Sequence, residues 1–178
     1  MIDARNYYAV EEKLRDGTEV IIRAVRPDDA DRLVNAFRQL DPQSVYARFF
    51  GYRKEPTADE LARLDTLDFV REVALVATKM TDDKAVIGGA RYVTRDVDGV
   101  RAAEVAFTVE EAYQGRGLAG RLLKHLIVIA RDAGIERFEA EVLSENKPML
   151  AVFERSGLPV KQSRTSGIVH VELELSTK

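Results

Sequence analysis

The sequence predicts an α/β fold, of the α+β mixed-sheet kind, with a central, mostly antiparallel sheet of about seven strands flanked by helices. Two observations support this expectation. Segments 72–79, 85–95 and 100–109 are rich in β-branched residues and are joined by short polar turns, as in an antiparallel meander. Before and after this meander, stretches with helical spacing of apolar residues alternate with further strand candidates.

The composition limits the classes of function that the chain can have. With 178 residues, 46% hydrophobic and 32% charged, we expect one globular domain. The absence of cysteine excludes disulfides, thiolate nucleophiles and cysteine-based zinc sites, and with only two histidines we expect no metal. A net charge of −3 does not favour nucleic-acid binding. No apolar run reaches the roughly 20 residues of a membrane helix. The N-terminus lacks a signal peptide, so we expect no membrane association and a cytoplasmic protein.

The first elements follow a polar N-terminal stretch. We assign residues 1–16 to an extension that could form a short helix, and residues 17–178 to the domain. The turn Asp16-Gly17 leads into a β-branched strand over Thr18–Arg26. Pro27 then begins a helix with an acidic first turn.

Helical spacing returns in two later regions. Residues 43–66 predict two short helices, the second beginning at the capping box Thr57-x-x-Glu60. The strongest helix pattern begins at Leu118, carries apolar residues on one face and has Gly134 as its C-terminal cap. The remaining elements are a strand, a helix and two strands, over 136–143, Asn146–Arg155, 158–165 and 167–175.

Three glycines, Gly115, Gly117 and Gly120, lie between the meander and the strongest helix. Glycines at a helix start expose backbone N–H groups to an anion, and the helix dipole adds to the attraction. The loop therefore predicts a phosphate or pyrophosphate site, with a tight turn that binds no ligand as the alternative. The spacing also fits the dinucleotide-binding pattern Gly-x-Gly-x-x-Gly. We reject that interpretation because residues 110–114 separate the strand from Gly115, and the preceding strands do not form βαβ units.

Two motifs resemble those of the GNAT superfamily of N-acetyltransferases. Gln114-x-x-Gly117-x-Ala119 is similar to the superfamily's acyl-CoA-binding signature, Q/R-x-x-G-x-G/A. The later block, 146–158, is similar to its N-x-P-x-x-x-x-Y-E-K-x-G-F pattern. The resemblance covers residues 18–175 and implies a GNAT fold with acetyl-CoA as co-substrate and no metal.

Further segments resemble the acetyltransferase domain of bacterial protein lysine acetyltransferases, namely 14–18, 22–29, 46–50 and 72–77. Those enzymes often carry an additional regulatory domain, and we expect this chain to hold only the catalytic part. This resemblance implies transfer of an acetyl group from acetyl-CoA to a protein lysine, such as one on an acyl-CoA synthetase.

The resemblance also implies which residues act. Glu104 matches the general base of the protein-acetylating branch, and its apolar neighbours lead us to expect a buried carboxylate, which is a better base. A solvent-facing strand carboxylate is the alternative. Family members pair the pantetheine arm with the backbone of this strand and hold the pyrophosphate in the glycine loop. The implied cofactor-binding residues are Phe107, Thr108, Val109, Gln114, Gly115, Arg116, Gly117, Leu118, Ala119 and Gly120.

Two residues of the later block complete the implied cofactor site. Asn146 matches an asparagine that contacts the cofactor near its sulfur, and it also suits a helix N-cap. Phe153 stands where many members have a tyrosine that can protonate the leaving thiolate, and a phenyl ring has no proton to donate. We expect Phe153 to be a core aromatic that can also pack against the cofactor arm. Tyr46 and Arg48 lie in a region that borders the acceptor groove of this fold and could touch substrate.

Three functions follow as hypotheses. The leading one is a protein lysine acetyltransferase. The second is an acetyltransferase for a small amine, such as a polyamine or an aminoglycoside, because charges of both signs over 38–68 favour neither acceptor. The third is a non-catalytic acyl-CoA-binding sensor, against which the presence of Glu104 argues.

Overall fold

A single sheet organises the molecule. The computed structural model describes residues 8–51 and 55–176, and within them the sheet has eight strands in the order β1-β2-β3-β4-β5-β6-β8-β7. Every neighbouring pair is antiparallel except β5 and β6, which are parallel. This confirms the predicted mixed, mostly antiparallel sheet, with one strand more than expected. The strands are β1 (Ala9–Lys13), β2 (Glu19–Ala24), β3 (Glu72–Lys79), β4 (Asp82–Val97), β5 (Val100–Val109), β6 (Arg137–Leu143), β7 (Val160–Thr165) and β8 (Ile168–Glu174).

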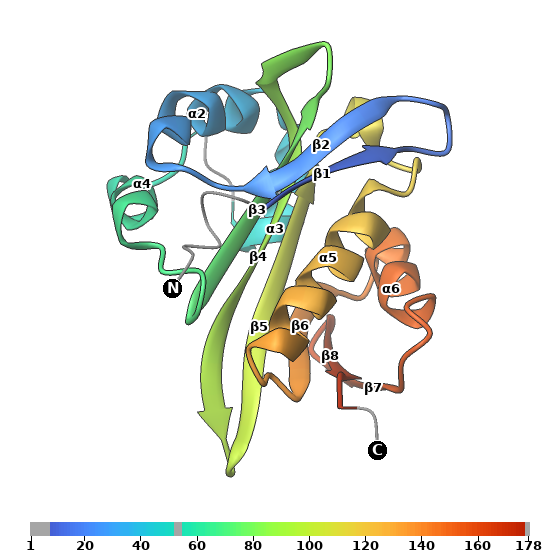
Figure 1. Ribbon diagram of the computed structural model, residues 1–178. Coiled ribbons are helices and arrows are strands. Elements are labelled where there is room, and N and C mark those ends of the chain that lie inside the picture. The colour runs from blue at the N-terminus through green and yellow to red at the C-terminus, as the bar shows by residue number, and fades with distance from the viewer. Residues whose placement is uncertain (1–7, 52–54, 177–178) are drawn as a thin grey trace.

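Helices lie on both sides of this sheet. In Figure 1, α5 and α6 are on one side, and α2 and α4 are on the other. Three short 3-10 helices, η1, η2 and η3, connect larger elements. The helices are η1 (Pro27–Asp29), α2 (Ala30–Arg38), α3 (Pro42–Phe49), α4 (Ala58–Ala62), η2 (Arg63–Thr66), η3 (Glu111–Tyr113), α5 (Leu118–Asp132) and α6 (Lys147–Glu154).

The additional strand, β1, lies within the segment predicted as an N-terminal extension. Ala9 pairs with Arg23 and Lys13 pairs with Glu19, so the prediction of a short helix is wrong for this part. Because β1 is an edge strand and stays largely exposed, its sequence shows no alternation of apolar and polar residues. Residues 1–7 of the predicted extension lie outside the described part of the chain.

Tight turns make β4 longer than predicted. Val97 pairs with Val100, and the two residues between them, Asp98 and Gly99, have φ values of 51° and 80°. This is the pattern of a two-residue hairpin turn, which requires positive φ at both positions. At the other end Lys79 pairs with Asp82, so Asp82 and Asp83, which lie in the expected polar turn between segments 72–79 and 85–95, belong to β4 itself.

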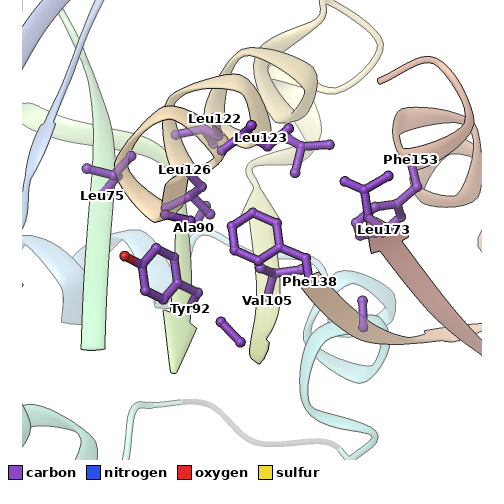
Figure 2. Close-up of a cluster of buried hydrophobic side chains, with 14 of the residues drawn as sticks. Leu75, Ala90, Tyr92, Val105, Leu122, Leu123, Leu126, Phe138, Phe153 and Leu173 are labelled. Atoms are coloured by element: carbon purple, nitrogen blue, oxygen red, sulfur yellow. The ribbon is translucent and has the colours of Figure 1, made fainter. Parts of the chain in front are cut away.

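The main core lies between α5 and the sheet. Figure 2 shows Leu122 and Leu126 of α5 above the buried side chains of Tyr92, Val105 and Phe138. The Tyr92 and Phe138 rings have centroids 5.6 Å apart. Burying each such side chain contributes about 1.5–3 kcal/mol, so this contact fixes α5 firmly over β4 and β5. The predicted apolar face of the helix is confirmed.

A buried ion pair connects β2 to the start of α2. Arg23 donates two hydrogen bonds to the carboxylate of Asp29, at 2.7 and 2.8 Å, and the Arg26 N–H donates a third at 2.7 Å. Arg23 is 7% exposed and Asp29 is fully buried. Burial opposes ionisation of Asp29, but the hydrogen bonds from Arg23 and Arg26 and their charges hold the pKa of this carboxyl below its usual value.

Candidate active site

The sheet splits open on one side of β5. β6 pairs with β5 only at Ala102, Ala103 and Glu104, and the last pair is Glu104 with Glu139. On its other side β5 stays paired with β4 as far as Val109. Within residues 8–51 and 55–176, the segment 105–109 therefore has one edge without a partner strand. Glu104 lies at the apex of the wedge between β5 and β6.

The open edge of β5 presents main-chain hydrogen-bonding groups. The Glu110 N–H donates to the Ile87 carbonyl oxygen at 2.9 Å, while Val109 lies opposite Gly88. In an antiparallel ladder this makes Val109 a non-hydrogen-bonded partner of Gly88, so its N–H and C=O face away from β4. Phe107, two residues earlier, faces the same way. Both sequence-predicted backbone contacts are thus directed into the wedge.

The glycine loop begins where the wedge is widest. Gly115 and Gly117 have φ values of 75° and 90°, which favour glycine, and α5 starts directly afterwards at Leu118. The Gln114 side chain donates to the Val109 carbonyl oxygen at 3.0 Å and so links the loop to β5. The first N–H groups of α5 have no partner within the helix, which leaves them available to an anion.

A glycine outside the loop, Gly88, which the sequence analysis missed, allows α5 to pack close to β4. A Cβ on Gly88 would lie 2.9 Å from Leu118 Cδ2 and 3.1 Å from the Thr108 carbonyl oxygen. Only a residue without a side chain lets the first turn of α5 approach β4 this closely. The pair Gly88-Gly89 inside a strand pattern was the available signal, because glycine inside a strand often marks a close approach.

A groove of about 1070 Å³ runs along the wedge and the glycine loop. Its cationic side chains outnumber its acidic ones, since among the described residues Glu141 is the only acidic one in the lining. The cationic residues are Arg15, Arg48, Arg121, Lys124, Lys147 and Arg155. Of the predicted cofactor-binding residues, the lining includes Phe107, Thr108, Val109, Gln114, Gly115, Gly117, Leu118, Ala119, Gly120, Asn146 and Phe153. Backbone amides and cations together suit a polyanionic ligand with an extended arm.

Arg116 is the predicted residue that the groove does not include. Its guanidinium forms a 2.6 Å ion pair with Asp16 and lies 5.2 Å from the centroid of the Tyr113 ring. Arg116 therefore lies outside the groove lining with its charge paired to Asp16, and its place near the phosphates stays a prediction. The residue that lines the groove at this place is Arg15, from the turn between β1 and β2.

Asn146 and Phe153 both have structural roles on α6. The Asn146 side chain accepts a hydrogen bond from the Met149 N–H at 3.3 Å, which confirms the predicted N-cap. Phe153 is 1% exposed and packs edge-on against Phe107 of β5, with ring centroids 5.9 Å apart. The core role expected for Phe153 is confirmed, and through Phe107 it supports the strand at the wedge.

The expected burial of Glu104 is wrong. Its side chain is 56% exposed, because Ala103 and Val105 face α5 and place Glu104 on the opposite side of the sheet. There it lines a second cavity of about 520 Å³, between the sheet and helices α2 to α4. Ala106 and Thr108 line both this cavity and the groove, and so does Arg48 of α3. The two spaces therefore adjoin beside Glu104.

An ion-pair network continues from Glu104 across the sheet. Arg95 lies 3.9 Å from the Glu104 carboxylate and donates to Glu139 at 2.6 and 3.1 Å. Burial opposes ionisation of Glu139, but the hydrogen bonds and charge of Arg95 lower the pKa of its carboxyl. The His170 imidazole forms a hydrogen bond with Glu141, and this hydrogen bond raises the pKa of His170. Among the described residues, Glu139, His170 and Glu172 hold possible ligand atoms within 4.8 Å of one another, but Arg95 already binds Glu139. This arrangement is therefore an ion-pair network.

Of Tyr46 and Arg48, the two residues predicted to border the acceptor groove, one lines the cavity beside Glu104. Arg48 lines the 520 Å³ cavity, whereas Tyr46, also on α3, does not line it. Within the described residues, no helix is long and apolar enough to cross a membrane.

Comparisons with known proteins agree with this geometry. The model of the Acetyltransferase (GNAT) family matches residues 36–158. The chain is 35% identical over 163 residues to the acetyltransferase Pat of Mycolicibacterium smegmatis, covering 92% of this chain and 48% of that protein. It is 32% identical over 139 residues to an acetyltransferase of Pseudomonas aeruginosa, covering 78% of this chain and 74% of that one.

Solved structures show the same similarity. The crystal structure of the GNAT domain of S. lividans PAT superposes with a TM-score of 0.84 at 38% identity, covering 93% of this chain and 96% of that one. The chain thus spans about half the length of the M. smegmatis relative and nearly all of the S. lividans domain.

Proposed function

Because this chain belongs to the Acetyltransferase (GNAT) family, whose members are acetyl-CoA-dependent acetyltransferases, we propose that it acetylates the ε-amino group of a lysine on a protein. The observation that carries the proposal is the wedge between β5 and β6. The groove along this wedge and the second cavity adjoin at the same part of β5, and Glu104 lies there.

The groove fits an acetyl-CoA molecule. CoA combines an extended pantetheine arm with a pyrophosphate and a third phosphate. The backbone of Phe107 and Val109 can pair with the amides of the arm as an added strand would. The N–H groups of the loop 115–120 and the surrounding cations suit the pyrophosphate. The bound thioester supplies an activated acetyl group.

The residues of the second cavity act on the acceptor. A lysine amine has a pKa of about 10.4, so it must lose a proton before it can attack a carbonyl carbon. Glu104 lies on the cavity side of β5, where its carboxylate can accept that proton directly or through a water molecule. Its exposure in the free protein leaves it accessible to an incoming amine, which would itself displace water from the site.

The protein acceptor is supported by the extent of the similarity. Identity to the M. smegmatis acetyltransferase Pat extends over 92% of this chain, well beyond residues 36–158 that match the family in general. The segments 14–18 and 22–29, which resemble bacterial protein lysine acetyltransferases, lie outside that family match. The first forms the β1–β2 turn, and the second runs from the end of β2 through η1.

Glu104→Gln tests the catalytic assignment, because the amide keeps the shape but cannot accept a proton. General-base catalysis contributes about 10²- to 10⁴-fold, so we expect thiol release from acetyl-CoA at neutral pH to slow by that factor. Acetyl-CoA affinity should change little, and higher pH should partly restore the rate because more of the amine is neutral. Glu174→Gln is the control, since it removes a carboxylate from the same sheet face two strands away. Equal rates for wild type and Glu104→Gln would place the base elsewhere.

The acceptor is tested by comparing substrates at equal lysine concentration. Folded proteins with exposed lysines, acyl-CoA synthetases among them, are compared with lysine peptides, polyamines and aminoglycosides. We expect an intact protein to be acetylated most efficiently. A small amine that is acetylated as well as any intact protein would favour the small-molecule alternative. Binding of acetyl-CoA without transfer to any amine would favour a sensor.

A further inference from the structure

The turn between β1 and β2 reaches the cofactor groove from outside the family's loop motif. It packs beside the glycine loop that precedes α5 (Figure 1), and the Arg15 N–H donates to the Arg116 carbonyl oxygen at 3.2 Å. In the same turn, Arg15 directs its side chain toward Gly117. A Cβ on Gly117 would lie 3.1 Å from Arg15 Nε and 3.5 Å from Nη2. The guanidinium thus lies over Gly117, which immediately precedes the first N–H groups of α5.

The turn holds Arg15 in a defined place. Leu14 is 3% exposed and belongs to the main core, so the residue before Arg15 is anchored. Asp16 accepts hydrogen bonds from the Thr18 N–H at 3.1 Å and the Thr18 hydroxyl at 3.0 Å, and Gly17 adopts a φ of 90°. A side chain presented from such a turn loses less conformational freedom on binding than one on an unconstrained loop.

The charge of Arg15 is left for a ligand. Three arginines surround the start of α5, and two of them already have carboxylate partners. Arg116 pairs with Asp16 at 2.6 Å, and Arg121 pairs with Glu12 at 2.6 Å. Within the described part of the chain no carboxylate pairs with Arg15, which is exposed and lines the groove. An unpaired guanidinium beside a row of backbone N–H groups is suited to a phosphate, which it can bind through two hydrogen bonds.

We propose that Arg15 binds the pyrophosphate of the acetyl donor and makes the β1–β2 turn part of the cofactor site. This inference rests on the proposed function, which supplies the ligand. It assigns the phosphate contact to Arg15 in place of Arg116, and it makes Arg15 a residue by which the protein distinguishes acyl-CoA from acyl groups carried on pantetheine alone.

Arg15→Gln tests the assignment, with Lys13→Gln as the matched control. Lys13 is exposed in the same hairpin, carries the same charge and does not line the groove. Affinity for acetyl-CoA is measured by calorimetry. In addition, kcat/KM is measured with acetyl-CoA, with acetyl-3′-dephospho-CoA, which keeps the pyrophosphate, and with acetyl-pantetheine, which has no phosphate.

A charge-assisted contact of this kind predicts an about 10- to 100-fold loss for Arg15→Gln with both pyrophosphate-containing donors. With acetyl-pantetheine, Arg15→Gln and wild type should be equal, and Lys13→Gln should match wild type throughout. Equal values for Arg15→Gln and Lys13→Gln with acetyl-CoA would overturn the proposal. A loss that disappears with the dephospho donor would overturn it too, since Arg15 would then bind the 3′-phosphate. If wild type itself fails to bind acetyl-CoA, the proposed function fails, and the assignment with it.

Discussion

The buried ion pair between Arg23 and Asp29 allows a test of how β2 is held to the start of α2 beside the 520 Å³ cavity. Asp29→Ala leaves Arg23, 7% exposed, without the carboxylate to which its guanidinium donates two hydrogen bonds. Removing one partner of a buried pair costs about 3–5 kcal/mol, because the remaining charge stays desolvated. A domain of this size has about 5–15 kcal/mol of unfolding free energy, so the loss is a large share of the total.

Urea unfolding followed by circular dichroism measures this cost. With an m-value of about 2 kcal/mol/M, the midpoint of Asp29→Ala should fall by about 1.5–2.5 M. Asp28→Ala is the control in the same turn, because the Asp28 side chain is 69% exposed and its ion pairs are 3.8 and 4.0 Å long. Such surface pairs contribute about 0–1 kcal/mol. The double variant Arg23→Met/Asp29→Leu should recover part of the loss, since it leaves neither charge of the pair buried. The Arg26 N–H and Arg32 still lose the Asp29 carboxylate as an acceptor, so recovery stays incomplete.

The acid limb of stability gives an independent measurement. The pKa of Asp29 is lowered in the folded state, so its contribution is fully present above the unfolded value of about 3.9. It is lost as the pH falls through the lower, folded pKa. The stabilities of wild type and Asp29→Ala should therefore begin to converge as the pH falls below about 4, and should meet below the folded pKa. A constant difference down to acid pH, or equal midpoints for Asp28→Ala and Asp29→Ala, would refute this account of the pair.

Two further predictions concern α6. Asn146→Ala removes the acceptor for the Met149 N–H and should lower the unfolding free energy by about 1 kcal/mol, whereas Asn146→Asp keeps the cap. Calorimetry with acetyl-CoA then separates the two roles of Asn146. A loss of affinity in Asn146→Asp would mean that the Asn146 side chain contacts the cofactor, whereas full affinity would limit Asn146 to capping. Phe153→Leu should cost about 1 kcal/mol and keep most of the turnover, because Phe153 has no proton to give, while Phe153→Ala should cost about 3–5 kcal/mol. A folded Phe153→Leu variant without turnover would contradict the packing role.

Elements with strong local signals could be predicted from the sequence. The apolar face and C-terminal glycine of α5, the glycine loop and the strands of the meander follow periodicity and turn rules that act over a few residues. The predicted cofactor-binding residues other than Arg116 line one groove because they lie on two adjoining segments, the end of β5 and the start of α5, and on α6. Their grouping depends on chain connectivity more than on long-range packing.

Features decided by distant parts of the chain could not be predicted. β1 is a strand because the edge of β2 offers it partners, and its own residues carry no strand pattern. Arg116 and Arg15 are near the same loop, but only the fold shows that Asp16 takes Arg116 as its partner and leaves Arg15 over Gly117. Glu104 has apolar neighbours in sequence, yet its exposure depends on which face of the sheet the helices cover.

The position of Glu104 shows how one change in strand pairing can organise the whole site. From Ala102 to Glu104, β5 has a partner strand on both sides, and beyond Glu104 no described strand pairs with its β6 side. The residues on either side of Glu104, Ala103 and Val105, remain fixed in the core under α5, so the strand cannot bend away to close the gap. In the free protein water can satisfy this open edge, and a ligand that excludes water from the groove must supply hydrogen-bonding partners of its own. A ligand pairing there would end beside Glu104, where the groove and the second cavity adjoin.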